Sequence, residues 1–118
     1  HPTAISSTLD GLRKKVGEAK IYAVIEPRSN TMRLGQHRAA LAASTAQADE
    51  VLWYSPANLN WSLDDVVNDS VVPAQVFADI DGITAYLQKV AVAGDHVLIM
   101  SNGGFGGIHQ KLLDRLAE

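Results

Sequence analysis

Two loop sequences contain most of the groups that could bind a ligand. The segment 101–107 (SNGGFGG) contains four glycines directly ahead of a helical pattern. Glycine lets the backbone approach a ligand closely, and free N–H groups at the start of a helix can bind an anion. The spacing does not match G-x-G-x-x-G and the segment follows the last strand, so a dinucleotide fingerprint is not indicated. A tight strand-to-helix turn that needs positive φ explains the glycines equally well.

A second group of polar residues directly follows a strongly apolar segment. Hydrogen-bonding side chains are frequent over residues 26–33: Glu26, Arg28, Ser29, Asn30, Thr31 and Arg33. The guanidinium of Arg28 or Arg33 can bind a carboxylate or phosphate through two hydrogen bonds. The alternative is a solvated loop with surface arginines, because charged side chains are normally exposed.

The remaining chemistry-bearing residues do not form a recognisable constellation. The four histidines show no pair at metal-ligand spacing and cysteine is absent, so no metal site is predicted. His96 opens a strand and is interpreted as structural, whereas His109 lies beside the glycine loop and either faces a ligand or packs at the surface. Ser101 is not part of G-x-S-x-G, so no hydrolase nucleophile is indicated. The chain lacks G-x-x-x-x-G-K-[ST], so a loop that holds ATP phosphates must lie elsewhere if ATP is used.

Composition restricts the class of protein. A length of 118 residues fits one domain, and 47% hydrophobic with 19% charged residues is ordinary for a folded one. The net charge of −3 provides no broad basic field, so Trp53, Tyr54 and Trp61 are interpreted as core or interdomain packing rather than base stacking. No apolar run has the length of a membrane span. The absence of cysteine fits a cytoplasmic protein. The start at His1 has neither an initiator Met nor a signal-peptide pattern, which favours a fragment of a longer chain.

Helical and extended patterns alternate along the chain. Helices are predicted over 3–16, 34–46, a short segment capped by Ser62, 80–91 and a last segment from 108. Strands are predicted at 20–26, 50–54, 75–77 and 96–100, the last as the clearest central strand. Gly17 and Gly94 are expected to end the helices before them, and the last helix is expected to bury Ile108, Leu112, Leu113 and Leu116.

This alternation predicts an α/β fold. Strands that alternate with helices imply right-handed crossovers and a Rossmann-like, doubly wound, mostly parallel sheet with helices on both faces. Ligands bind beyond the carboxyl ends of the strands in such sheets. The expected binding loops are therefore 27–33, 55–61, 77–79 and 101–107.

Three segments resemble a known family. The sequence EPRSNTM at 26–32 and the sequence MSNGGFGGIHQKLL at 100–113 resemble the C-terminal domain of Mur ligases, in particular those that attach a murein tripeptide. The opening HPTAI at 1–5 is similar to the end of the Asp-aromatic-Ala-His-His-Pro hinge before that domain. The resemblance covers essentially all of residues 1–118 and implies a single Mur ligase C-terminal domain from a larger three-domain enzyme.

The resemblance implies a bacterial, cytoplasmic, ATP-dependent ligase of peptidoglycan recycling. Such an enzyme joins L-Ala-γ-D-Glu-meso-diaminopimelate to UDP-N-acetylmuramate and cleaves ATP to ADP and phosphate. Its partners are the N-terminal domain, which holds the UDP-sugar, and the central domain, which holds most of the ATP and Mg²⁺ contacts. The C-terminal domain closes over the nucleotide and presents the peptide. It has no catalytic residue that would work alone, so the isolated domain is expected to show no ATP turnover.

The resemblance also implies roles for individual residues. Substrate binding is expected from one loop through Arg28, Ser29, Asn30 and Thr31, which would help to hold the carboxylates of the peptide or the nucleotide, with Arg33 as a weaker candidate. The final loop is expected to face the peptide through Asn102, Gly103 and Gly104, with His109 at the following helix start. His1 belongs to the hinge and is expected to border the nucleotide, although the hinge aspartate and first histidine are not in this sequence.

Two other classes of function fit the residues without the resemblance. The first is a stand-alone flavodoxin-like module that binds an anionic metabolite, and the second is a structural interaction domain. A phosphate-binding G-x-x-x-x-G-K-[ST] sequence upstream in the same gene would favour the ligase, whereas a reading frame that begins near His1 would favour the module.

Overall fold

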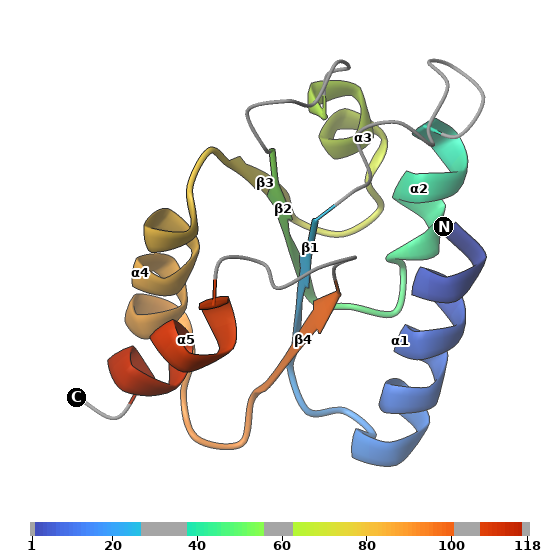
Figure 1. Ribbon diagram of the computed structural model, residues 1–118. Helices are drawn as coiled ribbons and strands as arrows, with labels where there is room; N and C mark the ends of the chain where they lie inside the picture. Colours follow the sequence, from blue (N-terminus) through green and yellow to red (C-terminus); the bar gives the residue numbers. More distant parts are fainter. Residues whose placement is uncertain (1, 27–37, 56–62, 101–106, 117–118) are drawn as a thin grey trace.

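The computed structural model describes residues 2–26, 38–55, 63–100 and 107–116. Helices and strands alternate through these residues in the predicted order (Figure 1). The elements are α1 (Pro2–Val16), β1 (Ile21–Ile25), α2 (Arg38–Ser44), β2 (Glu50–Tyr54), α3 (Asp64–Asp69), β3 (Ala74–Phe77), α4 (Ile80–Val90), β4 (His96–Met100) and α5 (Ile108–Leu116).

The four described strands form one parallel sheet in the order β3-β2-β1-β4. The chain moves from β1 outward to β2 and β3, then returns to the other side of β1 for β4. Ile25 of β1 lies opposite Trp53 on one side and Met100 on the other. This order equals the first four strands of the doubly wound dinucleotide-binding sheet. It confirms the predicted fold class, and the order reverses between β1 and β4.

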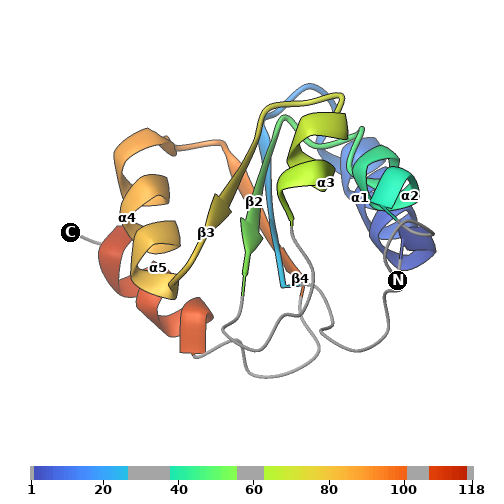
Figure 2. The ribbon, with the colours of Figure 1, turned by 90° about the horizontal axis from the view of Figure 1, so that it is seen from above.

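Helices cover both faces of this sheet (Figure 2). One face packs against α1, α2 and α3, and the other packs against α4 and α5. Successive side chains of a strand point to opposite faces. Ile21, Ala23 and Ile25 of β1 therefore join the first cluster, whereas Tyr22 and Val24 join the second. All five residues of β1 are buried, which makes this strand the centre of the domain.

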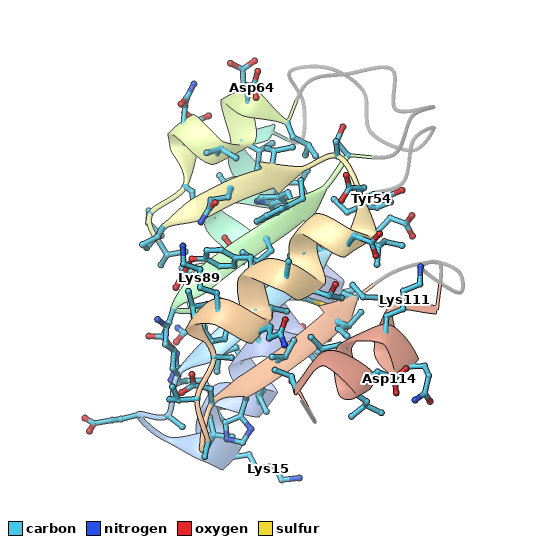
Figure 3. All side chains as sticks on the ribbon, turned by 90° about the vertical axis from the view of Figure 1, so that its left-hand side faces the viewer. Lys15, Tyr54, Asp64, Lys89, Lys111 and Asp114 are labelled. Atoms are coloured by element: carbon cyan, nitrogen blue, oxygen red, sulfur yellow. The ribbon has the colours of Figure 1, made fainter. Side chains whose placement is uncertain are left out.

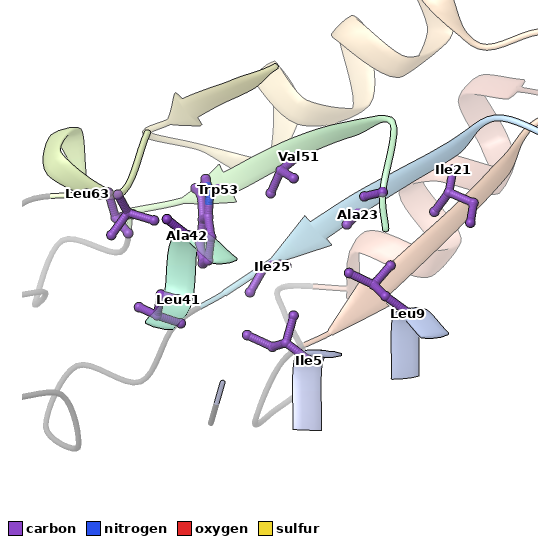
Figure 4. Packing of buried hydrophobic residues seen from close by; sticks show 12 residues of the cluster. Ile5, Leu9, Ile21, Ala23, Ile25, Leu41, Ala42, Val51, Trp53 and Leu63 are labelled. Carbon is purple, nitrogen blue, oxygen red and sulfur yellow. The ribbon is translucent and has the colours of Figure 1, made fainter. Parts of the chain in front are cut away.

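The larger cluster confirms the interpretation of Trp53 as a core residue. Figure 4 shows Trp53 packed with Leu63, Ala42 and Leu41, while Ile5 and Leu9 of α1 pack toward β1. The Trp53 side chain is fully buried, and its indole N–H has no hydrogen-bond acceptor within the described part of the chain. Trp53 therefore acts in this cluster through its apolar ring.

Local signals fix several element ends. Gly17 adopts φ +68° and its N–H donates to the Arg13 carbonyl at 2.9 Å, which ends α1 as predicted. Asp79 caps α4, because its carboxylate accepts from the Gly82 N–H at 2.6 Å. This cap sets the start of α4 directly after β3.

Two further helix ends were predicted from the single residues Ser62 and Gly94. Leu63 occupies the N-cap position of α3 without a side-chain hydrogen bond, and the cap predicted from Ser62 lies outside the described residues. α4 ends at Val90, with the Ala91 N–H donating to the Leu87 carbonyl. Gly94, at φ +97°, lies in the turn that follows rather than at the helix end.

Two predictions of burial near the C-terminus are also corrected. Ile108 and Leu112 are buried as expected, but the side chains of Leu113 and Leu116 are 63% and 44% exposed. α5 contacts the sheet and α4 along one narrow stripe, and these two leucines lie outside it. In addition, β4 is an edge strand of the described sheet rather than a central one. Its apolar sequence reflects packing on both faces, since Leu98 and Met100 join one cluster and Val97 and Ile99 the other.

Candidate functional site

The two motif-bearing loops begin at neighbouring positions of the sheet. β1 and β4 are adjacent and parallel, with Ile25 opposite Met100. One residue further on, the Glu26 N–H donates to the Met100 carbonyl at 2.9 Å. Glu26 and Met100, the last described residues before the two loops, therefore lie side by side. We call this place the β1–β4 carboxyl edge, defined by Ile25, Glu26 and Met100.

This edge is where the fold favours ligand binding. The strand order reverses between β1 and β4, and open α/β sheets bind ligands outside the carboxyl ends of the strands at such a reversal. The helices that follow the strands on the two sides of the reversal cover opposite faces of the sheet, α2 with one cluster and α5 with the other. The expectation that both polar loops start from one edge is confirmed.

Most of the predicted site residues lie outside the described residues. This applies to Arg28, Ser29, Asn30, Thr31 and Arg33 of the first loop, to Asn102, Gly103 and Gly104 of the final loop, and to His1. His109 is the second residue of α5, and its backbone alone is described. The roles assigned to these residues therefore stay predictions, while the anchor points of both loops are fixed by the sheet.

The described structure adds Glu26 and Tyr54 to the candidate site. Val24 and Leu52 lie opposite each other and pack toward α4 and α5. Two residues later, strand alternation sets Glu26 and Tyr54 side by side on the same face. Both side chains are half-buried. The sequence signal for Glu26 was an acidic residue directly after five apolar ones, whereas its pairing with Tyr54 required the strand register.

The environment of Glu26 disfavours its charged form. Partial burial raises the pKa of the Glu26 carboxyl above its ordinary value. Within residues 2–26, 38–55, 63–100 and 107–116, no side chain is found to form an ion pair or hydrogen bond with this carboxylate. Figure 3 shows Tyr54 and Lys111 toward one end of the α4–α5 face and Lys89 toward the other. Exposed Lys111 thus adds a positive charge to the same end of the domain as Tyr54.

The opposite, amino edge of the sheet contains charges that are paired with one another. Lys20 lies 3.0 Å from Glu50, and Glu50 also accepts a short hydrogen bond from the Tyr86 hydroxyl. The hydrogen bond with Glu50 raises the pKa of both Lys20 and Tyr86. The Lys20 ammonium also lies 4.8 Å from the centre of the Tyr22 ring. These contacts join the starts of β1 and β2 to α4.

A second pair joins the amino edge to α1. Arg13 contacts Asp49 at 2.8 Å, and the same carboxylate accepts from the Ile21 N–H at 2.8 Å. Burial pushes the pKa of Asp49 upward, but the hydrogen bonds from Arg13 and Ile21 outweigh it, so the pKa is lowered overall. Arg13 also donates to the carbonyls of Gln47, Gly17 and Ala19. This edge is therefore a structural clamp rather than a candidate site.

No group of three or more His, Cys, Asp or Glu side chains that could hold a metal ion occurs among the described residues. None of the helices in the described segments is long and apolar enough to cross a membrane.

Sequence comparison assigns the family that the fold and the two loops indicate. A family model for the glutamate ligase domain of Mur ligases matches residues 1–103. The chain belongs to the Mur ligase family and corresponds to its C-terminal domain. Two curated relatives are both UDP-N-acetylmuramate–L-alanyl-γ-D-glutamyl-meso-2,6-diaminoheptandioate ligases. The one from Escherichia coli K12 is 53% identical over 100% of this chain, and the one from Haemophilus influenzae is 47% identical over 98%.

Solved structures agree with this assignment. The murein peptide ligase of Psychrobacter arcticus matches with a TM-score of 0.91 and 46% identity, over 100% of this chain and 26% of that one. A domain from Haemophilus ducreyi, described as part of a UDP-N-acetylmuramate:L-alanyl-γ-D-glutamyl-meso-diaminopimelate ligase, matches with a TM-score of 0.82 and 44% identity, over 98% of this chain and 84% of that one. UDP-N-acetylmuramate–alanine ligase from Thermotoga maritima, at 17% identity and a TM-score of 0.73, shares the fold.

The comparisons also bear on the domain organisation. This chain spans about a quarter of the length of the two curated relatives, 26% in each case. A domain of a larger ligase is therefore favoured over the stand-alone module that the residues alone left open.

Proposed function

We propose that this chain is the peptide-presenting, closing domain of an ATP-dependent ligase that joins L-Ala-γ-D-Glu-meso-diaminopimelate to UDP-N-acetylmuramate in peptidoglycan recycling. The observation that carries the proposal is the position of the two motif loops. Parallel β1 and β4 start both loops at one edge, in a chain about half identical to two ligases named for this reaction. The substrates, ATP and a UDP-sugar, are consistent with a bacterial cytoplasmic location.

The reaction makes clear demands on such a domain. The muramyl carboxylate becomes an acyl phosphate at the expense of ATP, and the free amine of the peptide then displaces phosphate. Every substrate carries negative charge, so guanidinium groups and aimed N–H donors must hold the anions together. Arg28 and Arg33 would supply the guanidinium groups, and the loop around Gly103 would supply backbone N–H groups close to the peptide.

ATP and Mg²⁺ do not fit this chain by itself. Mg²⁺ is held by several oxygen ligands, and the described residues contain no cluster of acidic side chains for it. The whole sequence also lacks the G-x-x-x-x-G-K-[ST] phosphate loop. We therefore assign most contacts with the nucleotide and the metal ion to the other domains of the ligase, with His1 at their border.

Closure of this domain would protect the intermediate. An acyl phosphate is hydrolysed by water, so a domain that covers the reacting atoms raises the yield of amide. The β1–β4 carboxyl edge suits this task, because it stands on a core of fully buried side chains. Such a domain presents one half of a cleft, with the other half on the remainder of the ligase.

The test uses the intact ligase with the substitution Arg28→Ala. We expect the rate at limiting tripeptide to fall about 10- to 100-fold, because charge-assisted hydrogen bonds contribute about 1.5–3 kcal/mol. Thermal stability should stay within the range of surface substitutions. Lys14→Ala, which removes an exposed positive charge from α1, is the matched control. An unchanged rate with Arg28→Ala at limiting tripeptide would remove this residue from the site.

A further inference from the structure

We propose that the Glu26 carboxylate contacts the reacting amine of the peptide and accepts its proton before the amine attacks the acyl phosphate. This inference rests on the proposed function and assigns a catalytic residue to it. Glu26 directly follows β1 and is hydrogen-bonded to the end of β4, at the point where the strand order reverses.

The backbone fixes where the Glu26 side chain lies. Its N–H is held by the Met100 carbonyl at 2.9 Å, and its neighbour Ile25 is buried in the core. Strand alternation turns the carboxylate toward the α4–α5 face, beside half-buried Tyr54. A carboxylate anchored in this way stays at the β1–β4 carboxyl edge, where the first motif loop begins.

Its surroundings make this carboxylate suited to a cationic partner. Partial burial costs free energy that an ionised carboxylate recovers only from a cation or from hydrogen-bond donors. At the amino edge, by contrast, Glu50 has Lys20 and Tyr86, and Asp49 has Arg13. No such partner for Glu26 is found in the described part of the chain. A cation supplied by the substrates would complete its environment.

Charge complementarity identifies that cation. The phosphates, the UDP-sugar and the peptide carboxylates are all anionic, and the described residues provide no further acidic ligands for Mg²⁺ at this edge. Among the groups that the substrates bring, the peptide amines are therefore the cations. An α-amino group has a pKa of about 8, so at neutral pH most of the nucleophile is protonated and must lose a proton. A desolvated carboxylate is a stronger proton acceptor than an exposed one, because burial raises its pKa.

The proposed step balances without another reactant. The peptide ammonium transfers one proton to the Glu26 carboxylate, and the freed lone pair on nitrogen forms the C–N bond to the acyl carbon. The C–O bond to phosphate then breaks, and its electron pair stays on the phosphate oxygen. The second proton of the amine leaves with this group as hydrogen phosphate. Glu26 finally returns its proton to water.

The experiment compares two nucleophiles in the intact ligase with Glu26→Gln. Hydroxylamine is largely uncharged at neutral pH and captures an acyl phosphate as a hydroxamate without a proton acceptor. We expect ligation of the tripeptide to fall roughly 100- to 10,000-fold, the usual contribution of general base catalysis, while hydroxamate formation stays within about twofold. Circular dichroism and the thermal midpoint show whether the variant is folded.

Two controls separate this role from others. Glu18→Gln makes the same change at an exposed position in the turn between α1 and β1, at the other edge of the sheet, and should leave both products unchanged. A tripeptide analogue that lacks the second amino group of diaminopimelate should show the same loss with Glu26→Gln. If the loss vanishes with this analogue, Glu26 binds the distal ammonium and the inference is overturned.

The remaining outcomes are equally informative. Equal loss of amide and hydroxamate would place the effect of Glu26 on acyl phosphate formation or on the fold, and unchanged ligation would remove Glu26 from the reaction. Either result overturns this inference and leaves the proposed function intact. If the unsubstituted ligase forms neither product, the proposed function fails and the inference fails with it.

Discussion

The two edges of the sheet use charged residues in different ways. At the amino edge, Arg13, Asp49, Lys20 and Glu50 contact one another or nearby backbone groups at 2.7–3.1 Å. At the carboxyl edge, Glu26 is half-buried without a side-chain partner in the described part of the chain. Paired charges join elements of the same domain, whereas an unmatched charge beside two polar loops indicates a group supplied by a ligand. The comparison teaches that pairing, rather than the number of charges, separates a structural edge from a functional one.

The largest effect on stability is expected from Arg13→Ala. The Arg13 side chain donates to three backbone carbonyls and to Asp49, so its loss leaves several acceptors without a donor. We expect the free energy of unfolding to fall by about 2–3 kcal/mol, measured by urea denaturation. Ligation by the intact enzyme should be unchanged below the unfolding transition. A loss of activity without a loss of stability would contradict the structural role of the amino edge.

A matched pair of substitutions sharpens the contrast between the edges. Glu50→Gln keeps the shape of the side chain but removes the charge that pairs with Lys20 and accepts from Tyr86. We expect it to lower stability by about 1 kcal/mol with little effect on ligation. Glu26→Gln, the same change at the other edge, should lower ligation and keep the fold. If the two variants changed stability and ligation to the same extent, the contrast between the two edges would be contradicted.

The smallest effect is expected in the pH dependence of stability. The carboxylates of the two edges should change stability in opposite directions as pH rises. The pKa of Asp49 is lowered in the folded state, so its contribution is present above the unfolded pKa and is lost as pH falls through the folded pKa. The pKa of Glu26 is raised, so the folded state binds more protons and stability falls as pH rises from the unfolded to the folded pKa. As pH rises through the acidic range toward neutral, the thermal midpoint of Glu26→Gln should therefore fall less than that of the unsubstituted protein. As pH falls, the thermal midpoint of Asp49→Asn should fall less than that of the unsubstituted protein.

Much of the fold could be predicted from the sequence because apolar residues are spaced differently in buried strands and in covering helices. Five apolar residues from Ile21 to Ile25 indicated a strand buried on both faces, and helical spacing in α4 and α5 indicated covering helices. The shared edge of the two loops then followed from parallel pairing. Their separation in sequence gave no sign that they begin at hydrogen-bonded neighbours.

Other features depended on tertiary contacts that no local pattern encodes. Spacing shows that Leu113 and Leu116 share a face of α5, but not that this face stays exposed. The apolar sequence of β4 indicates burial on both faces of the sheet, but it does not indicate whether a further strand pairs with β4. Glu26 and Tyr54 lie far apart in sequence, and only the β1–β2 register brings them together.

The hydrogen bond between the Glu26 N–H and the Met100 carbonyl has a consequence for how ligand binding can be observed. This amide exchanges with solvent only when the ends of β1 and β4 separate. A molecule that bridges both loops would resist that separation, so deuterium uptake at this one position should slow when substrate binds. A single backbone amide would then serve as a probe of occupancy in the intact ligase, without a label and without turnover.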